Sequence, residues 1–541
     1  MKTLAFLLLG SIANPARKMA RPSSIVAVVG LAFLCVLYAA WPVWRAFFPM
    51  EIDLKEPWNA YHSDAVFGQG VLYPDLNGLI ANNYPPLWYY LTGALSQLGF
   101  DTIYLGRALS FASILVLVAA IALCIRQFKA AWPGAILGGL FFFGIMVRYA
   151  DWYVAMNDPH VPALAIMMVA LVWFLRRDPA RGAELPILLM VVAGFFKQAI
   201  IAIPAMTLFL LAQRSRWLAL RAALVGGGAA LAGLALFTAI YGRAFFDEIF
   251  LYPREMSFLR AWGSLGRLSP LLPALVPWAI WVWNDRKSEA ARFSTTFVLF
   301  TFAGFFIQKT GAGTDINAMF ELYVAVAVAT GLAFDRITLV PIFWGMSIAT
   351  RERLVAGVLA LSLVAAPGIE AYLLLISPSY REQFYKNAEM TRAEIERIAA
   401  IPGPVHCDVE TVCRAAGKPF VYDDFFIGQL GTVGRLTLPE LGCRVLAEGF
   451  RREWIDLRAS DLALQRELFY GRSPIQFLRG EAGTLGERLQ LGPLHTGVDA
   501  DDIVALRESA VRTGKNVLTS DQVSKIFNAP CHKLRVLDDV R

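Results

Sequence analysis

The chain has 541 residues, of which 57% are hydrophobic and only 17% are charged, with six cysteines and a formal net charge of +7. Soluble globular proteins are nearer half apolar and a quarter charged, so this composition excludes an ordinary soluble protein and indicates a polytopic membrane protein. The positive charge is shared among short loops between apolar runs. That distribution is a topology signal, and it predicts no nucleic-acid partner.

Residues 1–24 contain only a short apolar core, which a basic cluster follows instead of preceding it. This is the reverse of the order in a secretory signal peptide. We interpret the segment as a cytoplasmic lead-in.

Eleven apolar segments predict an α-helical membrane domain over residues 25–376. Several are shorter than the ~20 residues that a full crossing needs, so some should be tilted, broken or re-entrant. The expected spans are 25–44, 104–125, 132–147, 161–175, 185–196, 198–212, 221–241, 270–284, 293–307, 318–334 and 354–376.

Lysine and arginine are shared unevenly between alternate loops, with 18 in one set and 9 in the other. Because basic residues concentrate on the cytoplasmic side, the loops 45–105 and 148–160 and everything after residue 376 should face outward. The segment 185–212 leaves an alternative open, because a single span there would enclose Lys197 and reverse every later loop. Two short spans are favoured, since the loop 213–221 is basic and contains no acid.

The tail, residues 377–541, is polar and predicts a soluble α/β domain. Residues 392–400 have helical spacing, and residues 418–424 resemble a short strand that ends in a turn. An even set of cysteines in an exported domain predicts two disulfides, with free buried thiols as the alternative. The four candidates are Cys407, Cys413, Cys443 and Cys531, and the first two are close enough in sequence to pair.

The outer loop 45–105 is long for a connection between spans, and long ordered loops are usually functional. Three acids, Glu51, Asp53 and Glu56, open it close behind the first span. Its aromatic residues suit an interfacial belt, or equally stacking against a sugar ring. Those with candidate sugar or acceptor contacts are Trp58, Tyr61, Tyr84 and Trp88.

The loop contains "AYHSDAVFGQGVLYP", "NNYPPLWYYLTGAL" and "GRALS" in that order. It resembles the first outer loop of polytopic glycosyltransferases that use polyprenyl-phosphate sugars, the GT-C fold, which include protein O-mannosyltransferases and the aminoarabinose transferases of lipid A. Gly70, Tyr73, Pro85, Pro86 and Arg107 fill the places of that pattern. The segments "NDPHVPALA", "FFKQAIIAIPA" and "QKTGAGTDINAMFELYVAVAVA" resemble further parts of bacterial members.

The resemblance implies an inverting glycosyltransferase of the bacterial inner membrane, with its C-terminal domain on the extracytoplasmic side. Its donor would be a polyprenyl-phosphate-linked sugar, and its acceptor a hydroxyl of a glycan, lipid or protein. Spacing to Gly70 selects Glu56 as the leading acid and ranks it above Asp53, whose residue type is the usual one. Asp158 would be its partner, an acceptor ligand or a metal ligand. The plainer alternatives are solvated loop acids and, for Asp158, a helix N-cap.

Such a transfer also needs a cation to steady the charge that grows on the departing phosphate. Lys197 and Lys309 lie in turns between apolar runs and are the leading candidates, with Arg148 weaker, and snorkelling to the interface is the alternative. His62 and His160 are residue types that bind divalent metals, but five histidines without an i,i+4 pair disfavour a metal site. The sequence therefore predicts no certain cofactor.

Two other functional classes compete with the enzyme. A transporter or lipid-carrier flippase would be expected to show internal repeats and charges buried within spans, whereas here the charges gather in one set of loops. A non-catalytic envelope-assembly subunit would use the C-terminal domain to bind partners.

Overall fold

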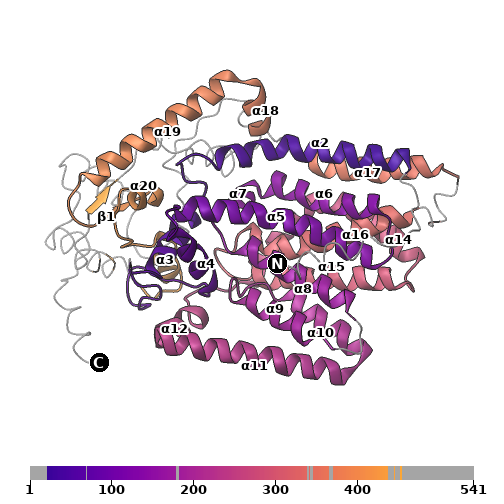
Figure 1. Ribbon diagram of the computed structural model, residues 1–541, viewed down its shortest axis with the longest axis horizontal. Helices are drawn as coiled ribbons and strands as arrows, with labels where there is room; N and C mark the ends of the chain where they lie inside the picture. The colour runs from indigo at the N-terminus through magenta and orange to yellow at the C-terminus, as the bar shows by residue number, and fades with distance from the viewer. Residues whose placement is uncertain are drawn as a thin grey trace.

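The computed structural model describes residues 21–68, 70–177, 182–337, 340, 345–364, 369–436, 441, 444 and 451–453. Its long helices lie roughly side by side, and small elements gather at one end of the bundle (Figure 1). Among these residues, seven helical runs are long and apolar enough to cross a membrane. Five are single helices: α2 (Pro22–Arg45), α5 (Thr102–Gln127), α6 (Trp132–Tyr149), α11 (Arg216–Tyr241) and α15 (Glu289–Lys309). The other two are composite: α13 (Phe258–Gly263) continues through the 3-10 helix η2 (Ser264–Leu271) into α14 (Leu272–Asn284), and the 3-10 helix η3 (Ile316–Met319) continues into α16 (Phe320–Arg336).

The remaining predicted spans are also helical but shorter. They are α8 (His160–Arg176), α9 (Glu184–Gly194), α10 (Ala202–Arg214), α17 (Ile348–Val364) and α18 (Ile369–Ile376). Helix is present in each of the eleven expected segments, and the predicted class of helical polytopic membrane protein is confirmed. The expected span 354–376 is divided between α17 and α18, and residues 365–368 lie outside the described residues. The lead-in lies outside the described residues except for its last four positions, and α2 already begins at Pro22.

Local sequence explains where several of these helices begin. The side chain of Asp101 accepts a hydrogen bond from Ile103 N–H at the start of α5, and Ser215 and Ser288 cap α11 and α15 in the same way. Such side chains satisfy backbone donors that have no partner in the first turn.

The centre of the bundle is α16, most of which is buried. Gly331 lets α16 approach α6 closely: an added Cβ would lie 2.6 Å from the carbonyl oxygen of Gly134 and 2.5 Å from Ile125 Cδ1. Small residues at such crossings let two backbones pack together where lipid provides no hydrophobic driving force.

The chain reverses direction between α9 and α10, at the turn that carries Lys197. Glu184 pairs with Arg221, Ile187 lies against Gly226, and Phe195 lies against Gly233, so α9 and α11 run parallel. With α10 between them in sequence, two short antiparallel segments fit the contacts better than one long span. At 1.5 Å per residue these helices are roughly 16 and 20 Å long, less than the ~30 Å hydrocarbon core.

The connections after α2, α6, α9, α11 and α15 meet at one end of the bundle. They contain α3 (Lys55–Ala65), α4 (Leu87–Ser96), α7 (Asp151–Val154) and α12 (Arg243–Phe250). Figure 1 shows α3, α4 and α12 at the same end as α20 and β1. Loops that are far apart in sequence are therefore close together in space there.

The segment after α18 continues through α19 (Pro378–Ala399), β1 (Val405–Cys407), α20 (Glu410–Ala415) and α21 (Asp424–Thr432) to β2 (Arg451–Glu453). The two strands pair in parallel, with Val405 opposite Arg451, which gives the described part of the tail its mixed α/β character. Residues 454–541 lie outside the described residues.

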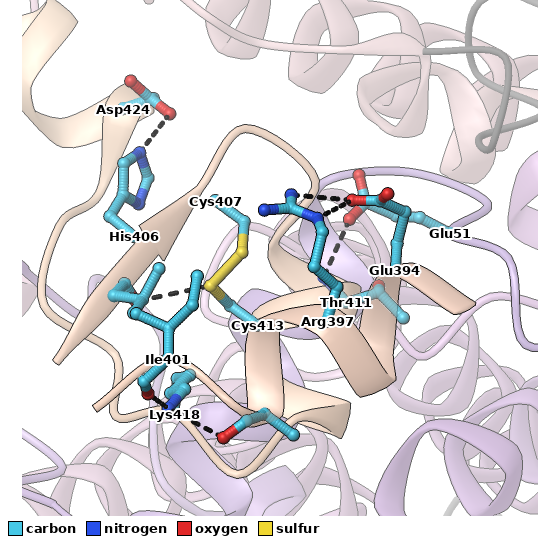
Figure 2. The surroundings of a disulfide bond; sticks show 12 residues. Glu51, Glu394, Arg397, Ile401, His406, Cys407, Thr411, Cys413, Lys418 and Asp424 are labelled. Atoms are coloured by element: carbon cyan, nitrogen blue, oxygen red, sulfur yellow. Dashed lines mark hydrogen bonds and ion pairs between the residues drawn. A yellow bond between two sulfur atoms is a disulfide. The ribbon is translucent and has the colours of Figure 1, made fainter. Parts of the chain in front are cut away.

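Cys407 and Cys413 form a disulfide that joins β1 to α20 (Figure 2). The predicted pairing of these two cysteines is thus present, whereas Cys443 and Cys531 lie outside the described residues. Beside the disulfide, Thr411 N–H donates to Glu51 at 3.1 Å, and Arg414 pairs with Asp64 at 2.8 Å. The tail is therefore anchored directly to the first outer loop.

The strand expected at residues 418–424 is wrong. No strand is assigned there, and α21 begins at Asp424. The extended residues before it run across the outer loop instead, where Asp423 N–H donates to the carbonyl oxygen of Leu79 at 2.9 Å. A single backbone bond to a loop replaces the ladder that a strand would need. The helix expected at residues 392–400 is present as part of α19.

Gly331→Ala should destabilise the bundle, because its Cβ would meet the backbone of α6, which cannot move aside as a flexible side chain could. We expect a loss of about 1–3 kcal/mol, typical of overpacking, measured as a lower thermal midpoint of the purified protein. Gly227→Ala on α11 is the matched control, since nothing lies within 4 Å of its added Cβ. Equal midpoints for both variants would contradict the close crossing of α6 and α16.

Candidate functional site

A buried ion pair ties the first outer loop to the start of the bundle. Glu56 is fully buried on α3, and its two carboxylate oxygens accept from Arg107 Nε at 2.9 Å and Nη2 at 2.7 Å. The same oxygens accept from the backbone N–H groups of Ile52 at 3.0 Å and Asn157 at 3.2 Å. Four donors thus occupy the carboxylate that spacing selected, leaving no lone pair of it for a further hydrogen bond.

Asp53 lies just before α3 in a more open position. Its Oδ1 accepts from Lys55 N–H at 3.0 Å and faces Lys55 Nζ at 3.2 Å, and no hydrogen bond to Oδ2 is found within the described ranges. Lys55 Nζ also pairs with Asp315 Oδ2 at 2.9 Å, which in turn accepts from the Tyr153 hydroxyl. Lys55 therefore links the first outer loop to the turn after α15.

Asp158 and Lys197 are two further charged residues that are buried beside this group. Asp158 Oδ1 accepts from His160 N–H at 2.7 Å, so the N-cap alternative has a basis, but Oδ2 is buried without a partner among the described residues. Lys197 is 3% exposed, and its Nζ lies 2.9 Å from the ring centroid of Tyr84. We call Asp53, Lys55, Asp158, Lys197 and Asp315 the charged cluster.

Burial and neighbouring charge set the protonation of the cluster. Burial lowers the pKa of Lys55, but Asp53 and Asp315 more than offset this and raise it well above its usual value. Burial alone would raise the pKa of Asp315, but Lys55 and nearby donors outweigh it and lower the pKa to about 2. Lys55 and Asp315 are therefore both ionised at neutral pH.

Asp158 and Lys197 behave differently. Burial raises the pKa of Asp158, and the charge of Lys197 opposes that effect. Burial likewise lowers the pKa of Lys197, and Asp158 opposes it. A buried carboxylate and a buried amine whose pKa values both move toward neutral pH can gain or lose a proton when a charged ligand binds beside them, as functional residues often do.

The four predicted aromatic residues divide into two groups. Trp58 and Tyr84 are half-buried and meet edge to face at 5.0 Å, with Tyr84 covering Lys197. Tyr61 instead stacks on Phe420 of the tail, and Trp88 is fully buried with its Nε1 donating to Asn157. Only the first pair borders the charged cluster.

Two of the predicted phosphate ligands have other contacts. Lys309 Nζ donates to the carbonyl oxygens of Thr314 at 2.6 Å and Asp315 at 2.7 Å, so it holds the turn that carries Asp315. Arg148 lies over the rings of Tyr38 and Tyr149. It belongs to a second charged group, which contains the Arg45–Asp151 ion pair.

The histidines do not assemble a metal centre in the part of the chain that the structure describes, where no group of three His, Cys, Asp or Glu side chains could hold an ion. His62 packs between Trp58, Tyr89 and Phe420. Burial lowers the pKa of His62 to about 3, so it stays neutral.

Sequence reasoning missed Lys55, Asp315 and Arg254. Lys55 and Asp315 pair across 260 positions of the chain, and Arg254 is likewise far in sequence from Lys197 and Tyr84, so the fold is needed to bring these charges together. Arg254 lines a cleft of about 420 Å³ together with Asp75, Tyr252 and Arg435. Burial is the main influence on the pKa of Lys197 and of Tyr84, and the positive charge of Arg254 is near enough to favour a lower pKa in each. The signal that could have found Lys55 was its place between two of the acids already singled out.

No protein-family model matches this chain, and no protein of curated function matches it. Among solved structures, the chain is similar to ArnT from Cupriavidus metallidurans in the apo state, with 13% identity, a TM-score of 0.48, and 84% of this chain and 94% of that chain covered. The structure of the same protein bound to undecaprenyl phosphate is similar with 13% identity, a TM-score of 0.48, and 85% of this chain and 95% of that chain covered. The chain is also similar to the archaeal oligosaccharyltransferase AglB from Archaeoglobus fulgidus, in complex with an inhibitory peptide and a dolichol-phosphate. The identity is 11% and the TM-score 0.40, with 74% of this chain and 64% of that chain covered.

Glu56→Gln should cost stability, because it leaves the buried guanidinium of Arg107 without a counter-charge. Breaking a buried pair from one side costs about 3–5 kcal/mol, so we expect a clearly lower thermal midpoint and a lower yield of folded protein. Asp53→Asn, which alters a more exposed acid with a similar substitution, should change stability by less than about 1 kcal/mol. If Glu56→Gln were as stable as the wild type, the ion pair would not have the structural role given to it here.

Proposed function

We propose that this chain is an integral-membrane glycosyltransferase that moves a sugar from a polyprenyl-phosphate donor to an acceptor hydroxyl. The observation that carries the proposal is the charged cluster: two carboxylates with an uncommitted oxygen and a buried lysine meet where the apolar helices end. A lipid-linked donor keeps its tail in the bilayer, so its phosphate can be reached only at such a boundary. The motif resemblance in the first outer loop supports the same reaction.

In this mechanism Lys197 holds the phosphate and steadies the charge that develops as the bond to the anomeric carbon breaks. Its amine is buried and makes no hydrogen bond within the described ranges, so a phosphate oxygen would gain a partner there without displacing another. Arg254 adds positive charge on the side of the aqueous cleft. A loss of positive charge here should weaken donor binding more than it changes the chemistry.

We assign the proton-accepting role to Asp53. Asp53 is reachable from the aqueous side, whereas the oxygens of Glu56 are occupied by four donors. Asp158 lies deeper beside Lys197, where its free Oδ2 can accept hydrogen bonds from hydroxyl groups of the donor sugar. The anomeric carbon becomes oxocarbenium-like in such a transfer, and a nearby carboxylate stabilises that charge.

Trp58 and Tyr84 form the aromatic border of the cluster and present ring area to a sugar. The cleft beside Arg254 opens on the aqueous side, which suits a glycan, lipid headgroup or protein acceptor. The loops of the cluster then face the extracytoplasmic side of a bacterial inner membrane, together with the C-terminal segment. The positive-inside asymmetry of the loops supports this orientation.

The full-length protein in lipid nanodiscs should bind undecaprenyl phosphate, and Lys197→Met should weaken that binding by about tenfold or more, because a charge-assisted contact is lost. Lys287→Met, in the loop between α14 and α15 at the other end of the bundle, is the matched control and should bind normally. Equal affinity for the two variants would remove Lys197 from the donor site.

Asp53→Asn should lower transfer from polyprenyl-phosphate sugars by about 10²–10⁴-fold while leaving undecaprenyl phosphate binding intact, as expected for loss of a general base. Transfer is measured over a panel of radiolabelled donors. Near-normal turnover would reject Asp53 as the base. Lipid flux in proteoliposomes without any transfer would favour the flippase alternative.

A reporter fused after residue 436 should be active only when that position is exported. The grounds are the excess of basic residues in the opposite loops and the chain reversal at Lys197. A fusion after residue 287 should give the opposite result. Cytoplasmic activity at residue 436 would reverse the proposed orientation of the whole cluster.

A further inference from the structure

The helix α21, which belongs to the segment after the spans, contacts the first outer loop, the turn that carries Asp315 and the loop that carries Arg254. Phe426 packs against Tyr252, two residues before Arg254. The Phe425 ring fills the space where Gly313 lacks a side chain, in the turn between Lys309 and Asp315. An added Cβ at Gly313 would lie 2.4 Å from that ring, so the two surfaces are in close contact.

Asp423, at the N-terminus of α21, makes the contact with the first outer loop. Its carboxylate is 3% exposed, and each oxygen has a separate task. Oδ1 accepts from Phe426 N–H at 2.9 Å and caps the helix, while Oδ2 accepts from Trp58 Nε1 at 2.9 Å. Its own backbone N–H is fixed by the carbonyl oxygen of Leu79.

Trp58 passes this constraint to the cluster. Its ring meets Tyr84 edge to face at 5.0 Å, and Tyr84 lies over Lys197 Nζ. An indole in this position can swing about its side-chain bonds unless its N–H is held. The hydrogen bond from Trp58 to Asp423 holds it, and so determines where the Tyr84 ring lies over the lysine.

We propose that Asp423 is a positioning residue of the site: through Trp58 it sets the Tyr84 ring that covers Lys197, so that the C-terminal segment controls access to the buried amine. This rests on the proposed function only for the identity of the ligand. An asparagine could not replace the carboxylate in this arrangement, because its amide nitrogen, a donor, would face one of the two N–H groups. The aspartate is thus required by two donors at once.

The reactivity of Lys197 toward an amine acylating reagent tests the geometry without any substrate. The rate of Lys197 acetylation by N-hydroxysuccinimidyl acetate is measured by peptide mass spectrometry on the full-length protein in nanodiscs. Trp58→Phe keeps an aromatic ring but loses the donor, and Asp423→Ser keeps a good helix cap but is too short to reach the indole. Each should raise the rate by about tenfold, the equivalent of one lost hydrogen bond.

The double variant should react no faster than either single variant, because both remove the same contact. Asp424→Ser, at the exposed next position, and the acetylation of Lys55 within each protein serve as controls and should be unchanged. Rates equal to the wild type, or additive increases in the double variant, would overturn the proposal. If Asp423→Ser fails to fold, Trp58→Phe alone decides.

Undecaprenyl phosphate binding by the same variants separates this inference from the proposed function. Wild-type binding that tightens by about tenfold in Trp58→Phe and Asp423→Ser, as expected when the ring no longer covers the amine, supports both. Absence of binding by the wild type, with the acetylation result as expected, rejects the donor but keeps the positioning role. Wild-type binding without any change in acetylation keeps the donor and rejects the positioning role.

Discussion

The pairing of Arg107 with Glu56 is the interaction on which the candidate site depends. One guanidinium, carried by α5, also donates to the carbonyl oxygens of Ala46, Phe48 and Met50 after α2. These carbonyls have no partner once the helix ends, and near the bilayer an unsatisfied backbone group is expensive. By satisfying them, Arg107 fixes the path of the chain from α2 into α3, and Asp53 and Lys55 lie on that path. Asp53 and Lys55 are therefore held in place by a deeper charge pair.

Much of the bundle could be predicted from the sequence, because long apolar runs leave the chain few alternatives to membrane helices. Each expected segment contains helix among its described residues, and the region around Lys197 forms two short segments, as its basic flank indicated. The tail could not be predicted as well. At residues 418–424 a strand-like pattern was present, but the partner of that backbone is Leu79, more than 300 residues earlier in the chain. Periodicity carries no information about such a contact.

The candidate site shows the same division. Spacing marked the first outer loop as the place where acids would matter, and it pointed to Asp158 and Lys197, which the structure brings near Asp53 and Lys55. Spacing to Gly70 ranks Glu56 above Asp53, but it records position and not environment. Burial and four hydrogen-bond donors make Glu56 a structural anchor, whereas Asp53, three residues earlier, keeps an oxygen free. Residues chosen from a motif are thus best ranked by which of their hydrogen bonds are already made.

The turn that carries Lys197 also needs support from inside the bundle. A chain that reverses between two short helices leaves backbone N–H groups unpaired at depth, and the start of α10 is such a place. Glu321 on α16 is 2% exposed, and its Oε1 accepts from Ile203 N–H at 2.9 Å. An acid at a helix N-terminus also suits the helix dipole. Glu321 therefore caps α10 from the most buried helix of the fold. The turn of Lys197 is thus supported from the core through Glu321, and Tyr84 of the first outer loop lies over its amine.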